Sequence, residues 1–291
     1  MLRDDLHMKL VPVPTDENGM NLDELERLVN LHKVSECDNP VFNAMIYSIP
    51  IYHNPAGFVM PPDRCRRLVE IARKYNLLLF SDDVYQLLHY DDDKPVPRPL
   101  DFDNEMDQDY QCNVLACGSF SKTFGPGLRL GWIEAKGRII KYLKERAMLL
   151  GSGGYNHYVS VVFRELLKSG EYHSYKEALR ADMKDMRDFL YQLFQENLPE
   201  GCNVTKPRGG FFMWLSMPEY CNAEELNFIT KKKYQVTVGP GLRFSADEKF
   251  NHCGRVSFAF FEKEDLADAV RGLCAGIREH IADKKQQLDS N

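Results

Sequence analysis

The sequence has little surplus charge and no long apolar segment. Its 291 residues hold 37 Lys and Arg against 43 Asp and Glu, a net charge of −6, so the basic face that nucleic-acid binding needs is not expected. No window approaches the roughly 18 consecutive apolar residues of a membrane-spanning helix. The first residues, MLRDDLHMKL, carry charges where a secretory signal needs an apolar core. We therefore predict a cytoplasmic protein that binds neither nucleic acid nor membrane.

The sequence also lacks paired cysteines, internal repeats and low-complexity tracts. Its eight cysteines form no CxxC pair and no Cys/His spacing of a zinc site. We predict no metal site and reduced, mostly buried thiols. The cysteines are Cys37, Cys65, Cys112, Cys117, Cys202, Cys221, Cys253 and Cys274.

The first half alternates between strand and helix patterns. Short apolar runs at 77–81, 113–119 and 129–134 predict strands that are buried on both faces. The short apolar run at 44–50 predicts a further strand, which breaks at the turn signal HNPAG. Residues 61–76 open with prolines and place apolar side chains on one face, which predicts a helix. This order predicts an α/β fold with a mostly parallel sheet and helices on both faces.

The second half has a different character. Residues 174–199 predict a long amphipathic helix. The segments 209–217, 234–241 and 254–261 favour strands, and a final helix is expected to begin at the acidic EKEDL and to fray in the tail KKQQLDSN.

These patterns predict two domains. Residues 1–170 form a three-layer α/β domain, and residues 171–291 form a connecting helix with a smaller α+β domain.

Three of the predicted strands end in polar residues that a plain turn would not need. They are followed by HNPAG (53–57), SDDVY (81–85) and SFSK (119–122). Ligands of open α/β sheets bind outside the carboxyl ends of the strands. We therefore expect an amide, a carboxylate, a phenol and an amine to converge on one site.

This combination of groups suits pyridoxal phosphate. The cofactor needs a lysine to hold it as a Schiff base, and a carboxylate that keeps its ring nitrogen protonated. Its ring hydroxyl needs hydrogen-bond partners, and its phosphate needs hydroxyls, backbone N–H groups and a cation.

At these residues the sequence resembles the class I/II, fold-type I pyridoxal-phosphate aminotransferases. The matching stretches are HNPAG, SDDVY and GSFSKTFGPGLRLGW, with weaker matches at KPRGGFFMWL, VGPGLRF and GRVSFAF. The SFSK form and the short spacing from lysine to arginine look most like the aminoadipate/kynurenine-type branch. The resemblance implies a transferase of amino-acid metabolism or biosynthesis that exchanges an amino group between an α-amino acid and a 2-oxo acid.

The resemblance also implies a role for each matching position. Lys122 would form the Schiff base and shuttle the proton, Asp82 would pair with the ring nitrogen, and Tyr85 would bond the ring hydroxyl. Asn54 would share that hydroxyl and take part in substrate binding.

The remaining positions concern anionic groups. Ser119, Ser121 and Arg129 would bind the cofactor phosphate, and Arg255 would bind the substrate α-carboxylate. Which amino acid and which 2-oxo acid react is left open by the sequence.

Several residues have simpler interpretations. Asp82 and its neighbour Asp83 are both candidate helix N-caps, and Asn54 also suits an Asn-Pro turn. His53 is interpreted as structural. Tyr155 and Asn156 lie where family members often reach toward a neighbouring subunit.

The resemblance begins in the middle of the family's large domain. Family members carry an earlier segment that helps to bind the phosphate and complete the dimer, so we expect a fragment, a shortened isoform or an incomplete gene model. A homodimer is expected if the full-length fold is present. Two alternatives stay open: a pyridoxal-phosphate lyase on the same scaffold, and a truncated, non-catalytic partner of a longer homologue.

Overall fold

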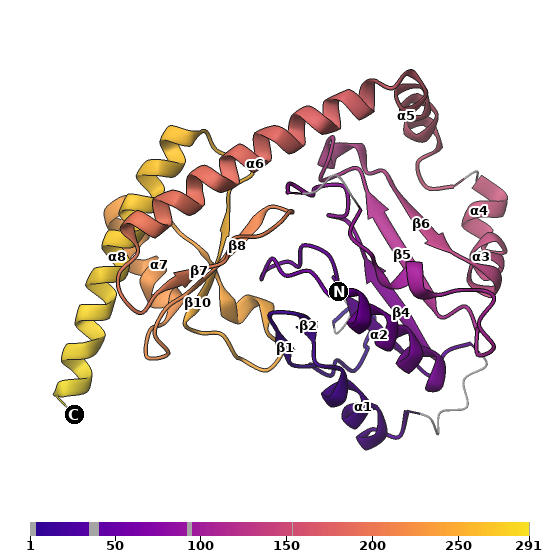
Figure 1. Cartoon of the computed structure of the whole chain (residues 1–291), viewed down its shortest axis with the longest axis horizontal. Coiled ribbons are helices and arrows are strands. Elements are labelled where there is room, and N and C mark those ends of the chain that lie inside the picture. Colours follow the sequence, from indigo (N-terminus) through magenta and orange to yellow (C-terminus); the bar gives the residue numbers. More distant parts are fainter. Residues whose placement is uncertain (1–3, 35–40, 92–94, 153, 291) are drawn as a thin grey trace. The chain divides into compact units, whose positions relative to one another are not determined.

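The computed structural model describes residues 4–34, 41–91, 95–152 and 154–290, and it divides into two compact units (Figure 1). We name residues 13–53 and 58–181 the N-terminal unit. The C-terminal unit comprises residues 54–57, 182–291 and the stretch before residue 13. The domain boundary predicted between residues 170 and 171 stays a prediction.

A four-stranded sheet forms the middle of the N-terminal unit, in the order β3-β4-β5-β6. The strands β3 (Ala44–Ser48), β4 (Leu77–Asp82) and β5 (Val114–Ser119) are parallel, and β6 (Gly131–Ala135) pairs antiparallel to β5. The predicted mostly parallel sheet is therefore confirmed, and its strands lie where the four apolar runs placed them.

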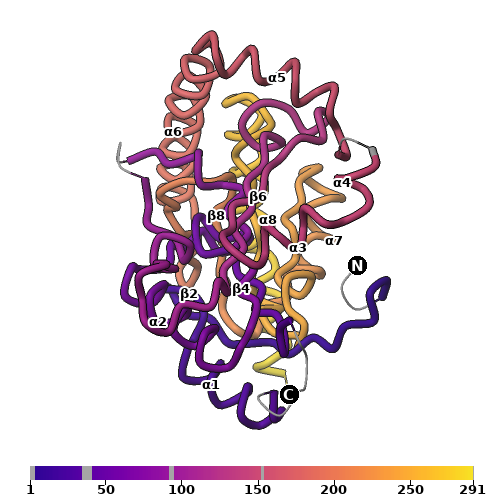
Figure 2. Tube along the Cα trace, turned by 90° about the vertical axis from the view of Figure 1, so that its right-hand side faces the viewer, coloured from indigo at the N-terminus to yellow at the C-terminus, as the bar shows by residue number. Residues whose placement is uncertain are grey.

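Helices cover both faces of this sheet, as predicted. The helices α1 (Leu22–Leu31) and α2 (Pro62–Lys74) pack together against one face (Figures 1 and 2). On the other face, Ile139 of α3 (Gly137–Lys144) packs with Leu115 of β5.

The remaining elements of the N-terminal unit are short or lie near its boundary. Asn21 caps α1 by accepting a hydrogen bond from the Glu24 amide at 3.0 Å. The elements are β1 (Thr15–Asp16), β2 (Gly19–Met20), η2 (Pro99–Phe102), η3 (Pro126–Leu128), α4 (Ala147–Ser152), α5 (His157–Ser169) and the start of α6 (Glu171–Asn197).

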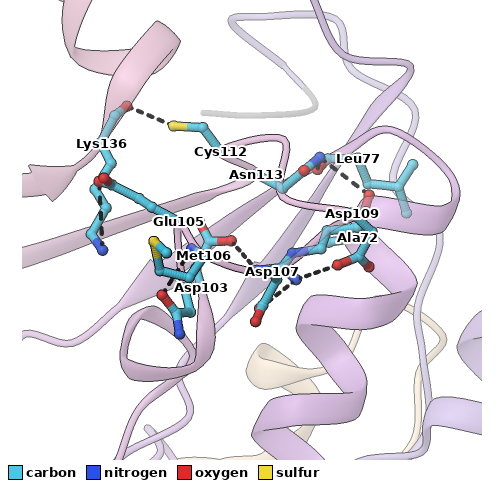
Figure 3. Close-up of polar contacts among 12 residues, drawn as sticks. Ala72, Leu77, Asp103, Glu105, Met106, Asp107, Asp109, Cys112, Asn113 and Lys136 are labelled. Atoms are coloured by element: carbon cyan, nitrogen blue, oxygen red, sulfur yellow. Dashed lines mark hydrogen bonds and ion pairs between the residues drawn. The ribbon is translucent and has the colours of Figure 1, made fainter.

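A network of ion pairs, of which the pair between Arg73 and Asp103 is buried, lies at the amino end of the sheet, where β4 and β5 begin (Figure 3). The Arg73 guanidinium, at the end of α2, lies 2.9 Å from Asp103 and 2.8 Å from both Asp107 and Asp109. Asn113, just before β5, donates to the carbonyls of Ala72 at 3.2 Å and Leu77 at 2.9 Å. These contacts fix the helix, the loop and the two strands to one another.

The C-terminal unit contains a second four-stranded sheet, in the order β7-β8-β10-β9. Its neighbouring strands are antiparallel, and they are β7 (Asn203–Val204), β8 (Phe212–Ser216), β10 (Cys253–Ser257) and β9 (Gly239–Pro240). A short η4 helix (Gly241–Phe244) follows β9.

The strand predicted over 234–241 is largely wrong. Only Gly239–Pro240 is extended in the sheet; Tyr234 is the last residue of α7 (Ala223–Tyr234), and residues 235–238 form neither helix nor strand. The sequence carried the signals of this helix: Asn222 caps it with bonds to Glu224 and Glu225, and lysines fill its last turn, which favours the helix dipole.

Two long helices were predicted correctly in position. The helix α6 covers the expected 174–199 region, and α8 (Lys263–Asp289) lies beside α7 (Figures 1 and 2). The tail was expected to fray, but α8 continues to Asp289. None of the helices in the described part of the chain has the length and hydropathy of a membrane span.

Candidate functional site

The lysine loop follows β5 and folds back on itself before β6. The Phe120 amide donates to the Leu130 carbonyl at 3.1 Å, and the Phe120 carbonyl accepts the Phe124 amide at 2.9 Å. The loop thereby holds Lys122 at the carboxyl end of the parallel strands. The Lys122 Nζ lies 5.8 Å from the centroid of the buried Tyr85 ring.

Aromatic side chains pack against this loop. The Phe120 ring contacts Trp132 at 4.8 Å and Phe163 at 4.2 Å between ring centroids. Next to Lys122, the buried Thr123 hydroxyl shares a 2.8 Å hydrogen bond with the Tyr172 hydroxyl. The loop that carries the amine is thus held by packed rings and a buried bond.

Gly118 is required by this packing. A Cβ atom at Gly118 would lie 2.1 Å from the Trp132 ring. The indole fills the space that a side chain would occupy, and its Nε1 donates to Glu134 at 2.8 Å. The glycine therefore lets Trp132 lie flat against the strand that leads into Ser119.

Asp82, the last residue of β4, is held by side chains from both neighbouring strands. The Tyr47 hydroxyl of β3 donates to Asp82 Oδ2 at 2.5 Å, and the Cys117 thiol of β5 donates to Oδ1 at 3.6 Å. Burial raises the pKa of Cys117 to about 12. Burial and the Asp82 bond raise the pKa of Tyr47 above its ordinary range. Both groups therefore stay protonated and act as donors.

The next residue, Asp83, has different surroundings. Its carboxylate is fully buried, accepts the Ser81 hydroxyl at 2.7 Å and lies 3.4 Å from Arg98. Arg98 also forms a two-point pair with Glu134, at 2.9 and 2.6 Å. Burial raises the pKa of Asp83 to about 6, although Ser81 and Arg98 oppose the shift. Asp83 is thus part of an internal network, and Asp82 is the acid at the strand tip.

The three residues expected at the phosphate lie on the same loop. Ser119 Oγ accepts the Ser121 amide at 3.1 Å. Arg129 has a left-handed backbone, with φ of 53°, and its Nη1 donates to the Pro126 carbonyl at 3.1 Å. Asn156 secures this turn by donating to the Arg129 carbonyl at 3.1 Å.

Asn54 and Arg255 lie together in the C-terminal unit. Arg255 Nη1 donates to Asn54 Oδ1 at 2.8 Å. The guanidinium also stacks on Phe212 and Phe244, at 4.2 and 4.8 Å from the ring centroids. The β10 arginine is therefore oriented by an amide and two rings.

The two further candidates, His53 and Tyr155, differ in how much of the side chain is exposed to solvent. His53 stacks on Phe58 with ring centroids 4.2 Å apart, and burial lowers its pKa to about 4. A neutral, stacked imidazole suits the structural interpretation. Tyr155 is 83% exposed.

Comparison with known proteins identifies the family of the chain. The sequence profile of the family "Aminotransferase class I and II" matches residues 6–273. The chain belongs to the class I and II aminotransferases. The mixed α/β fold predicted from the sequence is that of fold-type I aminotransferases.

Individual aminotransferases resemble the chain over most of its length. The chain is 29% identical to aromatic-amino-acid aminotransferase 1 of Thermococcus litoralis, covering 94% of the chain and 62% of that protein. The structure of Pyrococcus horikoshii kynurenine aminotransferase matches with a TM-score of 0.81 and 27% identity, over 92% of this chain and 63% of that one.

A third aminotransferase supports the predicted branch. The α-aminoadipate aminotransferase LysN of Thermus thermophilus matches with a TM-score of 0.80 and 26% identity, over 94% of this chain and 66% of that one. The chain thus spans less than two thirds of the length of the first two relatives.

Sequence reasoning missed the residues that hold the candidate site. Tyr47, Cys117 and Arg98 were not singled out, although they contact Asp82 or Asp83. The first two carry a signal in the strand pattern: once β3 and β5 flank β4, their side chains fall on the Asp82 face. In the described residues, no group of three or more His, Cys, Asp or Glu could hold a metal ion.

Proposed function

We propose that this chain is a pyridoxal-phosphate-dependent aminotransferase, moving an amino group between an α-amino acid and a 2-oxo acid. One observation carries the proposal: neighbouring parallel strands end in Asp82, held by two donors, and in the Lys122 loop, whose amine lies over Tyr85. The family match supports the same chemistry. The relatives whose structures contain the phosphopyridoxyl group or its amine form support the choice of cofactor.

The donor set of the N-terminal unit fits this cofactor. A carboxylate has about four lone-pair positions, and Tyr47 and Cys117 use one on each oxygen of Asp82. The remaining positions suit a protonated ring nitrogen. Ser119, Ser121 and Arg129 bring hydroxyls and a cation to one loop, as a phosphate requires.

Each residue then has a defined task. The cofactor, when bound, supplies an electron sink for the pair left at the substrate α-carbon. Lys122 would hold the cofactor and afterwards carry the α-proton, which is general acid–base work. Tyr85 and Asn54 would bond the ring hydroxyl. Arg255, already oriented by Asn54 and two rings, would bind the substrate α-carboxylate through its planar fork.

Mixing the purified chain with pyridoxal phosphate tests the proposal. We expect a visible absorption band that is absent in Lys122→Ala and retained in the exposed control Lys141→Ala. Incubation with amino acids then identifies the reaction: a 2-oxo acid together with the amine form of the cofactor indicates transfer, whereas released ammonia indicates a lyase. If wild type and Lys122→Ala give the same spectrum, the role of Lys122 is wrong.

We further propose a cytoplasmic homodimer that works in amino-acid biosynthesis. The seven cysteines in the described residues are free thiols, the state that a reducing compartment maintains. Apolar side chains on α4 and α5 remain exposed, including Leu150 and Tyr158, and would suit burial against a second copy. Sedimentation of the purified chain tests the dimer.

A further inference from the structure

The candidate cofactor acid, Asp82, is held by residues outside the set that the family motifs identify. In the sheet, Tyr47 lies opposite Phe80, two residues before Asp82, and Cys117 lies opposite Asp82 itself. A diagonal neighbour in a sheet is about 7–8 Å away, within reach of a long side chain. The tyrosine therefore reaches Asp82 across the sheet face.

The Tyr47 ring is fixed before its hydroxyl reaches Asp82. It stacks on Phe80, with ring centroids 5.9 Å apart and an interplanar angle of 24°. The hydroxyl then donates to Oδ2 at 2.5 Å, while the Cys117 thiol donates to Oδ1 at 3.6 Å from the other side. One donor on each oxygen fixes the rotation of the carboxylate about its Cβ–Cγ bond.

The two donors differ in strength. A hydroxyl bond to a carboxylate is a strong, charge-assisted bond, whereas a thiol is a weak donor. Burial and the bond to Asp82 both raise the pKa of the Tyr47 phenol, so the phenol stays protonated and cannot exchange roles with the acid. Tyr47 is the dominant member of the pair.

We propose that Tyr47 is a positioning residue that orients the Asp82 carboxylate toward the ring nitrogen of the cofactor. This inference rests on the proposed function for its ligand. Tyr47, a β3 residue that contacts Asp82, would then be one of the residues that determine how the cofactor binds.

Affinity measurements with two ligands test the inference. The ligands are pyridoxal phosphate and its 1-deaza analogue, in which a CH group replaces the ring nitrogen. Tyr47→Phe keeps the stacked ring and removes only the donor. We expect its dissociation constant for pyridoxal phosphate to rise about tenfold, which corresponds to about 1.4 kcal/mol, because a bond to a charged group is lost and water compensates part of the loss.

The same variant should bind the deaza analogue as tightly as wild type does. In an Asp82→Asn background, Tyr47→Phe should cause no further loss, because the acid that it orients is gone. Tyr142→Phe, an exposed tyrosine on α3, is the matched control and should change neither affinity. Equal losses for both ligands, full additivity with Asp82→Asn, or no loss at all would overturn the inference.

A measurement without cofactor separates this inference from the proposed function. In protein labelled with ¹³C-tyrosine, the Cζ resonance of Tyr47, assigned with Tyr47→Phe, should shift at neutral pH between wild type and Asp82→Asn, because the phenol loses its charged acceptor. An unchanged resonance shows that Tyr47 does not hold Asp82, whatever binds. If wild type binds neither ligand, the proposed function fails, while the resonance still decides the contact.

Discussion

The two ends of the sheet in the N-terminal unit use charged residues in opposite ways. At the amino end, Arg73 is paired with Asp103, Asp107 and Asp109, the three acids that Figure 3 labels. The guanidinium and Asp103 are almost completely buried. At the carboxyl end, Asp82 and Lys122 contact donors or a ring and are only partly buried.

The difference separates a structural use of charge from a chemical one. Buried pairs must satisfy each other, because an unpaired buried charge is costly. A site that binds a ligand must leave some of its hydrogen-bonding positions for that ligand. The amino end should therefore control stability and the carboxyl end should control chemistry.

The largest effect should come from Lys122→Ala. We expect amino transfer to fall by at least about a thousandfold, because both covalent attachment and proton transfer are lost. The free energy of unfolding should change by less than about 0.5 kcal/mol, since the side chain is only partly buried. Single-turnover kinetics and urea unfolding measure the two quantities, and a large loss of stability would contradict the comparison.

Arg73→Met should have the reverse effect. Its loss leaves Asp103, 1% exposed, without its cation, and breaking a buried pair costs about 3–5 kcal/mol. Arg67→Met on the same helix is the control: its pairs with Asp23 and Glu26 are exposed and should contribute less than about 1 kcal/mol. Urea unfolding compares the variants. Equal costs at Arg73 and Arg67 would show that burial does not set the difference.

The two ends also differ in how well the sequence predicts them. Strand positions and the polar strand tips followed from apolar runs and short motifs, so Asp82 and Lys122 could be named. The Arg73 network could not, because its acids come from a loop about 30 residues away and only the fold brings them together. The same reason hid Tyr47, whose partner is 35 residues away.

The local sequence pattern gave a wrong secondary structure at the end of α7, where a strand was predicted. The segment 234–241 holds alternating apolar residues, but α7, which is capped by Asn222 and packs on α8, extends into it as far as Tyr234. Gly276 of α8 comes so close to Thr230 that a Cβ would lie 2.3 Å from its methyl group. Packing of this kind overrides strand propensity.

Asp83 should make the carboxyl end sensitive to pH. Burial raises its pKa to about 6 from the ordinary value of 3.8. The folded state therefore holds the proton more tightly, so this stability is present below pH 4 and is lost as pH rises through 6. The contribution is on the order of 3 kcal/mol.

Asp83→Asn isolates this contribution. The unfolding free energy of wild type minus that of the variant should fall by about 3 kcal/mol from about pH 4 to pH 7. Urea unfolding at each pH measures this difference. Asp63→Asn, at an exposed position on α2, is the control that removes a carboxyl and leaves the buried Asp83 in place. A constant difference for Asp83→Asn would mean that Arg98 keeps the acid ionised throughout.

The smallest effect should come from Gly118→Ala, which separates the geometry of the carboxyl end from its charges. The added methyl would lie 2.1 Å from the Trp132 ring, so the indole must move, and overpacking of this kind costs about 1–3 kcal/mol. Gly127→Ala in the same loop is the matched control, because a Cβ at Gly127 would meet no atom within 4 Å. In Gly118→Ala, the free energy of unfolding measured with urea and the intensity of the cofactor absorption band should both fall. In Gly127→Ala, both should stay unchanged. If Gly118→Ala lowers stability without weakening the band, Trp132 supports the fold but does not position Lys122, and the separation between the two ends of the sheet becomes less sharp.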